Sequence, residues 1–292
     1  MANYVDVDPT GKASDFRCQP RTYDGHDGVD FAVRDLGVMR TGVPVLASAA
    51  GVVKNVREGM EDVALSDEAS RERIKGRECG NGVMIEHQGG WQTQYCHLRK
   101  GSVRVKSGDR VEVATPLGLV GLSGQTEFPH VHLTIRHKGE VVDPFTGQPM
   151  KAGCGLEAKP SWRSDQGVAY EEVALYNAGF ATGKPDIEAI RNGVRNDGPL
   201  QENVPALVLW VDIFGVQAGD RLRFLISGPK GEAMLDHEQE VEKTQARRFV
   251  FAGKSAPKRG WASGTYTGEV TLTRHQRDHA ITERIVRKLA VQ

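Results

Sequence analysis

Phe128-Pro-His-Val-His-Leu-Thr-Ile-Arg136 alternates polar and apolar residues, which is typical of a half-buried β-strand. Successive side chains of a strand point to opposite faces, so both histidines share a face with polar residues while the aliphatic residues face the core. The polar face carries His130, His132, Thr134 and Arg136, and the apolar face carries Val131, Leu133 and Ile135. On such a face one imidazole can bind a metal while its neighbour acts on whatever the metal holds. The alternative is a pair of half-exposed surface histidines.

The composition describes an ordinary globular protein that is mostly β. The chain of 292 residues is long for a single core, and 39% of its residues are hydrophobic and 26% charged. Its 34 glycines indicate many turns and short strands. Because 38 Lys and Arg balance 38 Asp and Glu, no net charge attracts the chain to nucleic acid or to an anionic membrane. We therefore expect two domains and no nucleic-acid partner.

The first residues and the cysteines bear on location. No apolar run approaches the roughly 18 residues of a transmembrane helix, and residues 1–9 are too polar for a signal peptide. The four cysteines include no Cys-x-x-Cys pair, which favours two disulfides in an exported domain. We therefore expect a periplasmic or secreted protein whose leader is absent from this sequence, with a cytosolic protein as the alternative.

A second polar cluster lies near the N-terminus, in His26-Asp-Gly-Val-Asp30. In an extended chain His26, Gly28 and Asp30 share a face. An imidazole and a carboxylate then flank a residue that has no side chain, so both can converge on one ion. The alternative is an exposed Gly-Asp turn.

A β-hairpin is predicted for residues 82–98, with Gly89-Gly90 as its turn. Counting back from that turn places Cys96 opposite Val83, only four residues from Cys79. The expected disulfides are therefore Cys79–Cys96 and Cys18–Cys154, the second joining the two ends of the domain. Four cysteines allow three pairings, and the sequence alone cannot choose among them.

Residues 57–78 form a charged interruption between two strand-like segments. Ser66, followed by Asp67 and Glu68, predicts the start of a short helix. The segment is interpreted as a solvated loop, with a substrate-contacting flap as the alternative. Beyond it, strand alternation predicts that His97 shares a face with Tyr95.

Several motifs occur in one order along the first half of the chain. They are His26-x-Gly-Val-Asp30, Gly80-Asn-Gly-Val, Tyr95-x-His97-Leu, Val105-Lys-Ser-Gly-Asp, Gly118-x-Val-Gly-x-Ser-Gly, His130-Val-His132-Leu and Val142-Asp-Pro. In this combination residues 22–145 resemble the lysostaphin-type (LytM-like) zinc endopeptidases of bacterial cell walls. The resemblance implies a small antiparallel β fold with an open groove over a zinc site.

By this resemblance the zinc ligands are His26, Asp30 and His132, and the paired catalytic histidines are His97 and His130. Three nitrogen and oxygen ligands leave a fourth position on Zn²⁺ for water, whose pKa the metal lowers towards about 7. Attack on a peptide carbonyl also needs a proton acceptor and a partner for the oxyanion, which two unligated histidines can supply. The charged interruption and the cysteines depart from the family pattern and leave the substrate preference open.

The resemblance ends after Pro144. Short strands separated by Gly-Pro and Gly-Asp turns then favour a β-sandwich, with an immunoglobulin-like sandwich as its specific form. Residues 185–193 predict one short helix, with Pro near its start and Gly after its end. The predicted strands cover residues 206–214, 221–227, 249–251, 265–273 and 281–291. His237, His275 and His279 have no carboxylate or cysteine at ligand spacing and are interpreted as surface residues.

The sequence therefore predicts an all-β, mainly antiparallel protein. Residues 1–154 are expected to form a lysostaphin-like zinc metallopeptidase domain, and residues 155–292 a linker and a β-sandwich. The expected activity is zinc-dependent hydrolysis of peptide bonds in peptidoglycan by attack of zinc-bound water, with a protein partner considered for the second domain.

Two alternatives remain. One is a non-catalytic domain of the same fold that binds wall peptides or activates another wall hydrolase, although such modules often lack one or more of the five site residues. The other is a lipoyl-like carrier domain, suggested by residues 105–113, which leaves the histidines unexplained.

Overall fold

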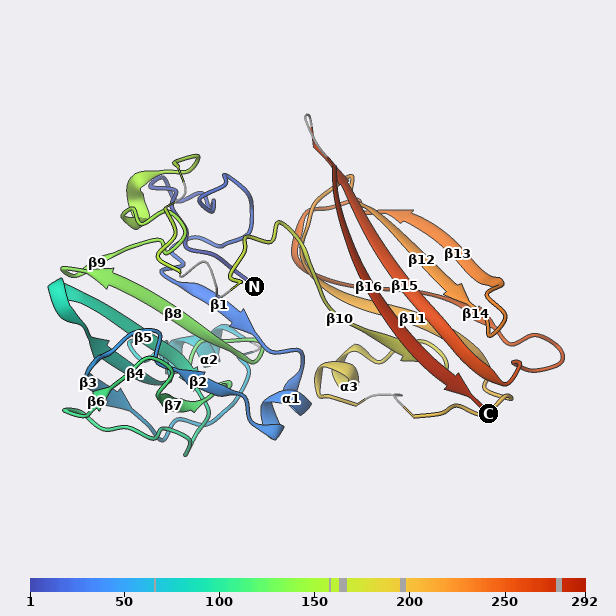
Figure 1. The fold of residues 1–292 in the computed structure, drawn as a ribbon, viewed down its shortest axis with the longest axis horizontal. Coiled ribbons are helices and arrows are strands. Elements are labelled where there is room, and N and C mark those ends of the chain that lie inside the picture. Colours follow the sequence, from blue (N-terminus) through green and yellow to red (C-terminus); the bar gives the residue numbers. More distant parts are fainter. Residues whose placement is uncertain (66, 158, 163–166, 195–197, 277–279) are drawn as a thin grey trace. The chain divides into compact units, whose positions relative to one another are not determined.

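The computed structural model divides the chain into two compact units, Met1–Tyr170 and Glu171–Gln292 (Figure 1). It describes all residues except 66, 158, 163–166, 195–197 and 277–279. All strand pairs in both units are antiparallel and the helices are short, so the predicted all-β, mainly antiparallel class is confirmed. No helix among the described residues is long and apolar enough to cross a membrane.

The first unit is built on a seven-stranded sheet with the order β1-β8-β5-β4-β3-β6, to which β9 adds beside β8. Its strands are β1 (Val29–Ala32), β3 (Gly51–Arg57), β4 (Asn81–Glu86), β5 (Trp91–Leu98), β6 (Arg110–Val111), β8 (His130–His137) and β9 (Glu140–Val141). A small second sheet pairs β2 (Pro44–Leu46) with β7 (Pro116–Leu119).

The core of this unit lies against one face of the large sheet. Buried Ile85, Leu133 and Ile135 of the large sheet pack with Val45 and Leu117 of the small one. The aliphatic side of β8 therefore faces the core, as its alternation predicts, and its other side is left for polar residues.

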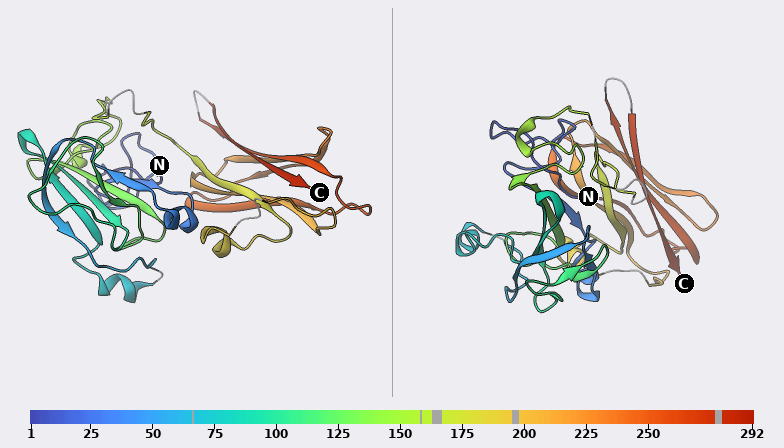
Figure 2. Two further views of the ribbon diagram at one scale, coloured as in Figure 1. Left: turned by 60° about the horizontal axis from the view of Figure 1, so that its bottom comes forward. Right: turned by 60° about the vertical axis from the view of Figure 1, so that its left-hand side comes forward.

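The helices of the first unit are α1 (Leu36–Thr41), α2 (Glu68–Arg73), η1 (Gln88–Gly90) and η2 (Met150–Ala152). The helix α2 is the one predicted within residues 57–78, and it projects from the edge of the sheet (the cyan helix in Figure 2, left). Asp67 caps it by accepting a hydrogen bond from Ser70 N, whereas Ser66 lies outside the described residues. Leu65, ahead of the helix, is buried and donates its N–H to Thr126 O at 2.9 Å. Leu65 therefore anchors the segment locally, while most of residues 57–65 are exposed, in line with the interpretation as a solvated loop.

Both predicted disulfides, Cys79–Cys96 and Cys18–Cys154, are present. The hairpin register that led to the first pair is wrong by one residue, because Val83 pairs with Tyr95 rather than with Cys96. The turn spans the three residues of η1 instead of two, and this moves the partners of Val83 to Glu86 by one position, up to the register shift between Asn81 and Val83.

The second unit is a β-sandwich of a three-stranded sheet, β10-β11-β14, and a four-stranded sheet, β13-β12-β15-β16. Its strands are β10 (Ala174–Ala181), β11 (Ala206–Val216), β12 (Arg221–Ser227), β13 (Ala233–Glu240), β14 (Gln245–Ser255), β15 (Gly264–His275) and β16 (Ala280–Val291). Both sheets contribute to one apolar core, for example Leu209 and Ile213 from one sheet and Phe224 and Val270 from the other. The predicted helix is α3 (Ile187–Arg191).

The scattered histidines of this unit follow the prediction where they are described. His237 and His275 are exposed, and His279 lies outside the described residues.

Two strands of this unit, β10 and β13, were not predicted.

Candidate metal centre

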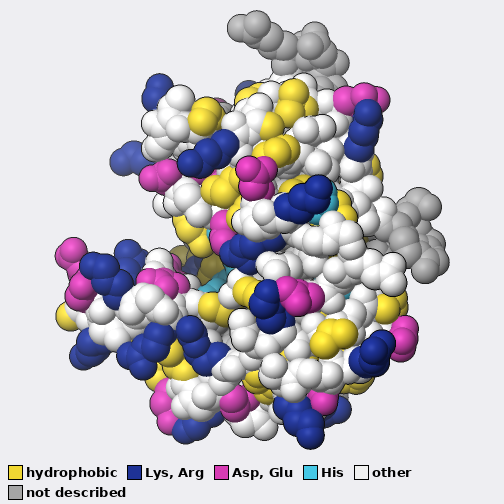
Figure 3. Space-filling view, turned by 90° about the vertical axis from the view of Figure 1, so that its left-hand side faces the viewer, with side chains coloured by type: hydrophobic (Ala, Val, Ile, Leu, Met, Phe, Trp, Pro, Cys, Tyr) yellow, Lys and Arg dark blue, Asp and Glu magenta, His cyan; other side chains and the backbone are white. Residues whose placement is uncertain are grey.

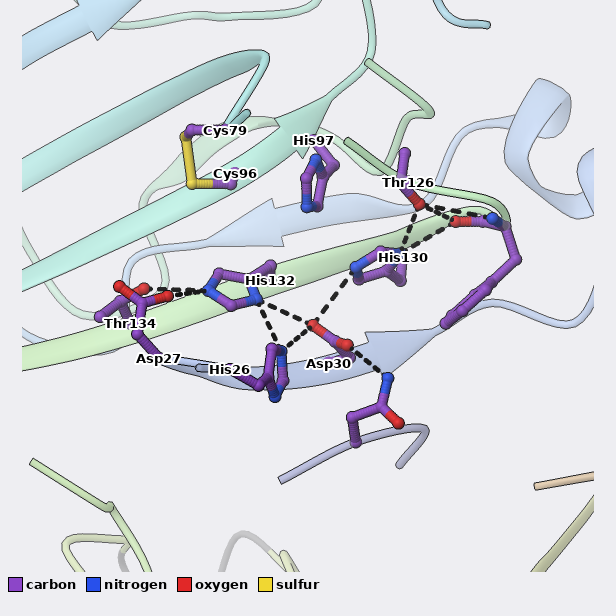
Figure 4. A network of polar contacts seen from close by, with 12 residues as sticks. His26, Asp27, Asp30, Cys79, Cys96, His97, Thr126, His130, His132 and Thr134 are labelled. Atoms are coloured by element: carbon purple, nitrogen blue, oxygen red, sulfur yellow. Dashed lines mark hydrogen bonds and ion pairs between the residues drawn. A yellow bond between two sulfur atoms is a disulfide. The ribbon is translucent and has the colours of Figure 1, made fainter. Parts of the chain in front are cut away.

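The polar face of the large sheet gathers a buried cluster of histidine and aspartate (Figure 4). The strand β8 contributes His130 and His132, and Asp30 of β1 stands directly opposite His132 in the sheet register. His26 precedes β1, and Figure 4 shows its ring pointing at the same spot. His26, Asp30 and His132 each offer one ligand atom, all within 4.8 Å of one another, and all three side chains are buried.

Three atoms form a nearly equilateral triangle. His26 Nε2 lies 3.1 Å from Asp30 Oδ1 and 3.0 Å from His132 Nδ1, and the latter two atoms are 2.9 Å apart. A tetrahedral Zn²⁺ with ligand distances of about 2.0–2.1 Å keeps its ligand atoms about 3.3 Å apart. A small outward movement of each side chain therefore suffices to fit the ion.

The outer ring nitrogens show that lone pairs face this triangle. His26 Nδ1 lies 2.6 Å from the backbone carbonyl of Tyr4, which can only accept, so Nδ1 carries the proton and Nε2 the lone pair. His132 Nε2 lies 3.1 Å from Asp27 Oδ1 and 3.0 Å from Thr134 Oγ1, so donation to the carboxylate leaves a lone pair on Nδ1. Two imidazole lone pairs and a carboxylate oxygen thus face one another, which is the donor set of a transition-metal site.

The electrostatics of the cluster favour a cation. Burial alone would raise the pKa of Asp30, but electrostatic interaction with His26 and His130 holds that pKa well below its usual range. Burial alone would lower the pKa of His132, yet its hydrogen bonds to Asp27 and Asp30 raise it to about 9. In the metal-free protein His132 therefore carries a second proton, on Nδ1, which supplies the positive charge that a metal ion would bring. The lone pair on Nδ1 becomes available to a metal ion when this proton leaves.

Gly28 makes the close approach of these strands feasible. A Cβ at this position would lie 2.5 Å from His132 Nε2 and 2.6 Å from Leu133 O. Any side chain here would displace the ring, so the predicted role of a residue without a side chain between His26 and Asp30 has a steric basis.

The two remaining histidines lie beside the triangle. The ring centroids of His97 and His130 are 4.7 Å apart, and both residues are buried. His97 Nδ1 lies 2.8 Å from Ser123 O, and His130 Nδ1 lies 2.9 Å from Phe128 O. Because carbonyls only accept, each Nδ1 carries a proton and each Nε2 is turned away from these anchors. His130 Nε2 lies 3.3 Å from Asp30 Oδ1.

His97 reaches this place against the predicted alternation. Tyr95 points to the core side, where its hydroxyl bonds to Ser48, whereas His97 contacts the rings of His130 and His132 on the other side. The prediction that His97 and Tyr95 share a face is therefore wrong. A break in the β4–β5 register and a φ of 61° at His97 mark the β-bulge that turns the residue over.

Residues that support the ligands were missed from the sequence. Asp27 accepts from His132 Nε2 with one oxygen and from Arg136 Nη2, at 2.9 Å, with the other. Asn3 donates its side-chain amide to Asp30 Oδ2 at 2.8 Å. The position of Asp27 beside His26 was a usable signal, whereas nothing in the polar first residues pointed to Asn3 or to the Tyr4 carbonyl.

One face of the molecule is hollowed. Figure 3 shows a hollow in the surface with histidine at its floor, next to an arm that carries many Lys and Arg side chains. A separate cavity of about 990 Å³ lies on the opposite side of the sheet, where it is lined by Trp91, Thr93 and Ile135. It contains none of the cluster residues.

Comparison with known proteins places this region in a family. Residues 24–144 match Peptidase family M23. The chain is 32% identical over 135 residues to the DD-carboxypeptidase/endopeptidase Mpg of Neisseria meningitidis, covering 45% of this chain and 25% of that protein. It is 31% identical over 118 residues to the peptidoglycan DD-endopeptidase ShyA of Vibrio cholerae, covering 40% of this chain and 22% of that protein. The matched segments thus span a quarter or less of these relatives.

A solved structure is also similar to part of this chain. The catalytic domain of lysostaphin from Staphylococcus simulans is 22% identical, with a TM-score of 0.31, and the alignment covers 48% of this chain and 85% of that one.

Proposed function

Because residues 24–144 form a domain of peptidase family M23 of the lysostaphin type, we propose that this chain is a zinc-dependent endopeptidase that hydrolyses peptide bonds in peptidoglycan. The observation that carries the proposal is the buried triangle of His26 Nε2, Asp30 Oδ1 and His132 Nδ1, whose three atoms approach one another this closely only with a proton or a metal ion between them. Relatives named as peptidoglycan DD-endopeptidases make crosslinking peptides the first substrates to test.

His26, Asp30 and His132 would hold the zinc ion through His26 Nε2, Asp30 Oδ1 and His132 Nδ1. When bound there, zinc supplies Lewis acidity, which lowers the pKa of water and polarises a carbonyl. Asp27 and the Tyr4 carbonyl keep both imidazoles in the tautomers that ligation needs.

His97 is proposed as the proton acceptor. Burial, together with the nearby charges of His130 and His132, lowers its pKa well below the usual range, so it is neutral at neutral pH. The Ser123 carbonyl holds the proton on Nδ1, which leaves the Nε2 lone pair for a proton released during attack on the substrate.

His130 is proposed as the partner of the developing oxyanion. Phe128 O and Thr126 Oγ1 fix Nδ1 at 2.9 and 3.1 Å, so the ring cannot rotate freely and Nε2 stays on the side of the metal cluster. With both ring nitrogens protonated, Nε2 is a donor that is already oriented and needs no reorganisation when charge develops.

The second unit is proposed to be an immunoglobulin-like sandwich that positions the enzyme or recognises a partner. Tyr266, near the start of β15, donates its hydroxyl to Ala262 O at 3.1 Å, the arrangement of a tyrosine corner. With the strands labelled A to G in chain order, the sheets are A-B-E and D-C-F-G, so the fourth strand lies beside C instead of E. The proposed location is the bacterial cell envelope, where peptidoglycan is found.

Digestion of purified peptidoglycan, followed by mass spectrometry of the fragments, tests the proposed function. Soluble peptide fragments are expected with the zinc-loaded protein, and they should disappear with a chelator and return when zinc is restored. A His97→Ala protein is the matched control for contaminating hydrolases. Sedimentation with peptidoglycan but no cleavage under any metal condition would instead identify a non-catalytic wall-binding module.

A further inference from the structure

His97 adopts a backbone conformation that side chains rarely allow. Its φ is 61°, in the left-handed region, although it lies within the strand β5. A residue with a side chain stays in such a conformation only where the surroundings impose it. The position of this imidazole therefore depends on whatever holds the backbone there.

The backbone at this point forms a β-bulge against β4. The β4–β5 register jumps between Asn81 and Val83, so Cys96 and His97 together stand against Gly82 alone. A bulge re-aims the side chain that follows it. Without the bulge, alternation would direct His97 into the core and away from His130.

Cys79 holds both residues of this bulge. It is bonded to Cys96 through the disulfide, with the two Cα atoms 4.8 Å apart, and its carbonyl accepts the N–H of His97 at 2.8 Å. Gly82 leaves room for this crossing, since a Cβ there would lie 2.8 Å from Cys79 Sγ. Figure 4 shows the Cys79–Cys96 disulfide beside His97, with Cys96 on the same strand as this histidine.

We propose that the Cys79–Cys96 disulfide is a positioning device for His97, which keeps the imidazole on the metal face of the sheet. The inference rests on the proposed hydrolytic function. It adds that full activity requires a disulfide that includes none of the proposed zinc ligands. The other disulfide, Cys18–Cys154, joins two residues that lie near the ends of the first unit and outside the strands β1, β5 and β8. It serves as the matched control.

A chain of contacts also leads from this disulfide towards a ligand. Gln94 donates to Cys79 Sγ at 3.3 Å and accepts from Arg136 Nη1 at 2.8 Å, and Arg136 binds Asp27. Zinc content has to be measured alongside turnover, because loss of zinc would indicate an effect through Asp27 instead of through His97.

The test compares a Cys79→Ser/Cys96→Ser protein with a Cys18→Ser/Cys154→Ser protein. The first is expected to bind zinc as before, with an unchanged KM, while kcat falls about 10- to 100-fold, since small misplacements of a catalytic group have effects of this size. The second is expected to keep its kcat. Equal kcat values in the two proteins, or loss of zinc from the first, would overturn the proposal.

A His97→Ala background shows whether the disulfide acts through His97. If it does, removing Cys79–Cys96 from a His97→Ala protein should reduce kcat no further, because residues that act as a unit are not additive. A further 10-fold loss in that background would show that the disulfide only supports the fold.

Two additional measurements keep the proposal testable. If the serine variant does not fold, the Cys18→Ser/Cys154→Ser protein can be folded, loaded with zinc and treated with a phosphine reductant, which then opens only Cys79–Cys96. Long-range ¹H–¹⁵N spectra of the imidazoles report the position of His97 without any substrate. A single Nδ1–H tautomer, held by Ser123 O, should become averaged when the disulfide is removed. If the parent protein does not cleave peptidoglycan, the proposed function fails, and an unchanged tautomer would still refute the positioning role separately.

Discussion

Both units bury carboxylates, but they neutralise them in different ways. In the second unit Asp220 accepts Nε–H and Nη2–H of Arg274, both at 2.8 Å, so two buried opposite charges satisfy each other. In the first unit Asp30 faces the ring nitrogens of two imidazoles, and only a proton or a metal ion between them makes these contacts favourable. A complete ion pair needs nothing from solution, whereas the incomplete cluster needs a cation. The difference distinguishes a buried charge that supports the fold from one that prepares a site.

The largest expected effect follows from removing one ligand. His26→Ala, Asp30→Ala or His132→Ala should lose zinc and peptidoglycan hydrolysis together, because two protein ligands do not hold an ion that needs three. Metal analysis and turnover measured on the same preparations check this. A ligand variant that kept its zinc would show that the triangle is not the metal site.

Breaking the completed pair should affect stability instead. Asp220→Ala removes the closest carboxylate from buried Arg274, and we expect a loss of about 3–5 kcal/mol in the unfolding free energy of the second unit, with zinc content unchanged. Chemical denaturation measures the loss. An Asp220→Ala/Arg274→Met protein should recover most of it, and a loss below about 1 kcal/mol for Asp220→Ala alone would contradict this interpretation.

Asp143 is a third buried carboxylate, and its hydrogen-bond donors are neutral. Its effect on stability should therefore depend on pH. Asp143 accepts from Phe145 N and Thr146 Oγ1, and burial raises its pKa to about 6. The folded state therefore binds a proton more tightly than the unfolded state, whose carboxyl has a pKa near 3.9. Stability of the first unit should be highest below about pH 4 as far as this group is concerned, and should fall by at most about 3 kcal/mol as the pH rises through 6. Denaturation of an Asp143→Asn protein over the same pH range should lack this fall.

The two unligated histidines should separate zinc binding from catalysis. His97→Ala and His130→Ala are expected to keep zinc while turnover falls about 10²-fold, the scale of one positioned acid, base or oxyanion partner. Zinc analysis and kcat of both variants check this. If His130→Ala lost its zinc while His132→Ala kept it, the two roles on β8 would be exchanged.

The smallest effect is expected at Asp27, which contacts His132 at Nε2, the ring nitrogen that does not face the proposed metal position. Asp27→Ala should weaken zinc affinity about tenfold, because His132 loses the acceptor that fixes its tautomer. Competition with a chromogenic chelator measures this affinity. Asp24→Ala, at an exposed neighbouring position, is the control and should leave the affinity unchanged.

Strict side-chain alternation could be predicted from the sequence, and local departures from it could not. The regular strand β8 placed His130 and His132 on one face and Leu133 in the core, as expected. His97 was assigned to the wrong face because a β-bulge depends on contacts with another strand, which the local pattern does not contain.

The same limit explains the strands that were missed in the sandwich. The strand β10 has a register shift between Leu175 and Asn177, which interrupts its pattern. The strand β13 lies at a sheet edge, where few of its side chains are buried and polar residues dominate. By contrast, β11 and β15 lie inside their sheets and carry long apolar patterns, so they were readily predicted.

The contact of His26 with the Tyr4 carbonyl bears on how such proteins are compared and trimmed. The segment that matches the family begins at residue 24, yet this carbonyl belongs to the preceding stretch and holds the tautomer of His26. Every residue type offers the same backbone carbonyl, so an alignment of side chains does not reveal this contact. Substitution at position 4 would preserve the contact, whereas deletion of the residue would remove it. The segment that the site needs is therefore longer than the segment that matches the family. A fragment that begins at residue 24 would lack the carbonyl that orients His26.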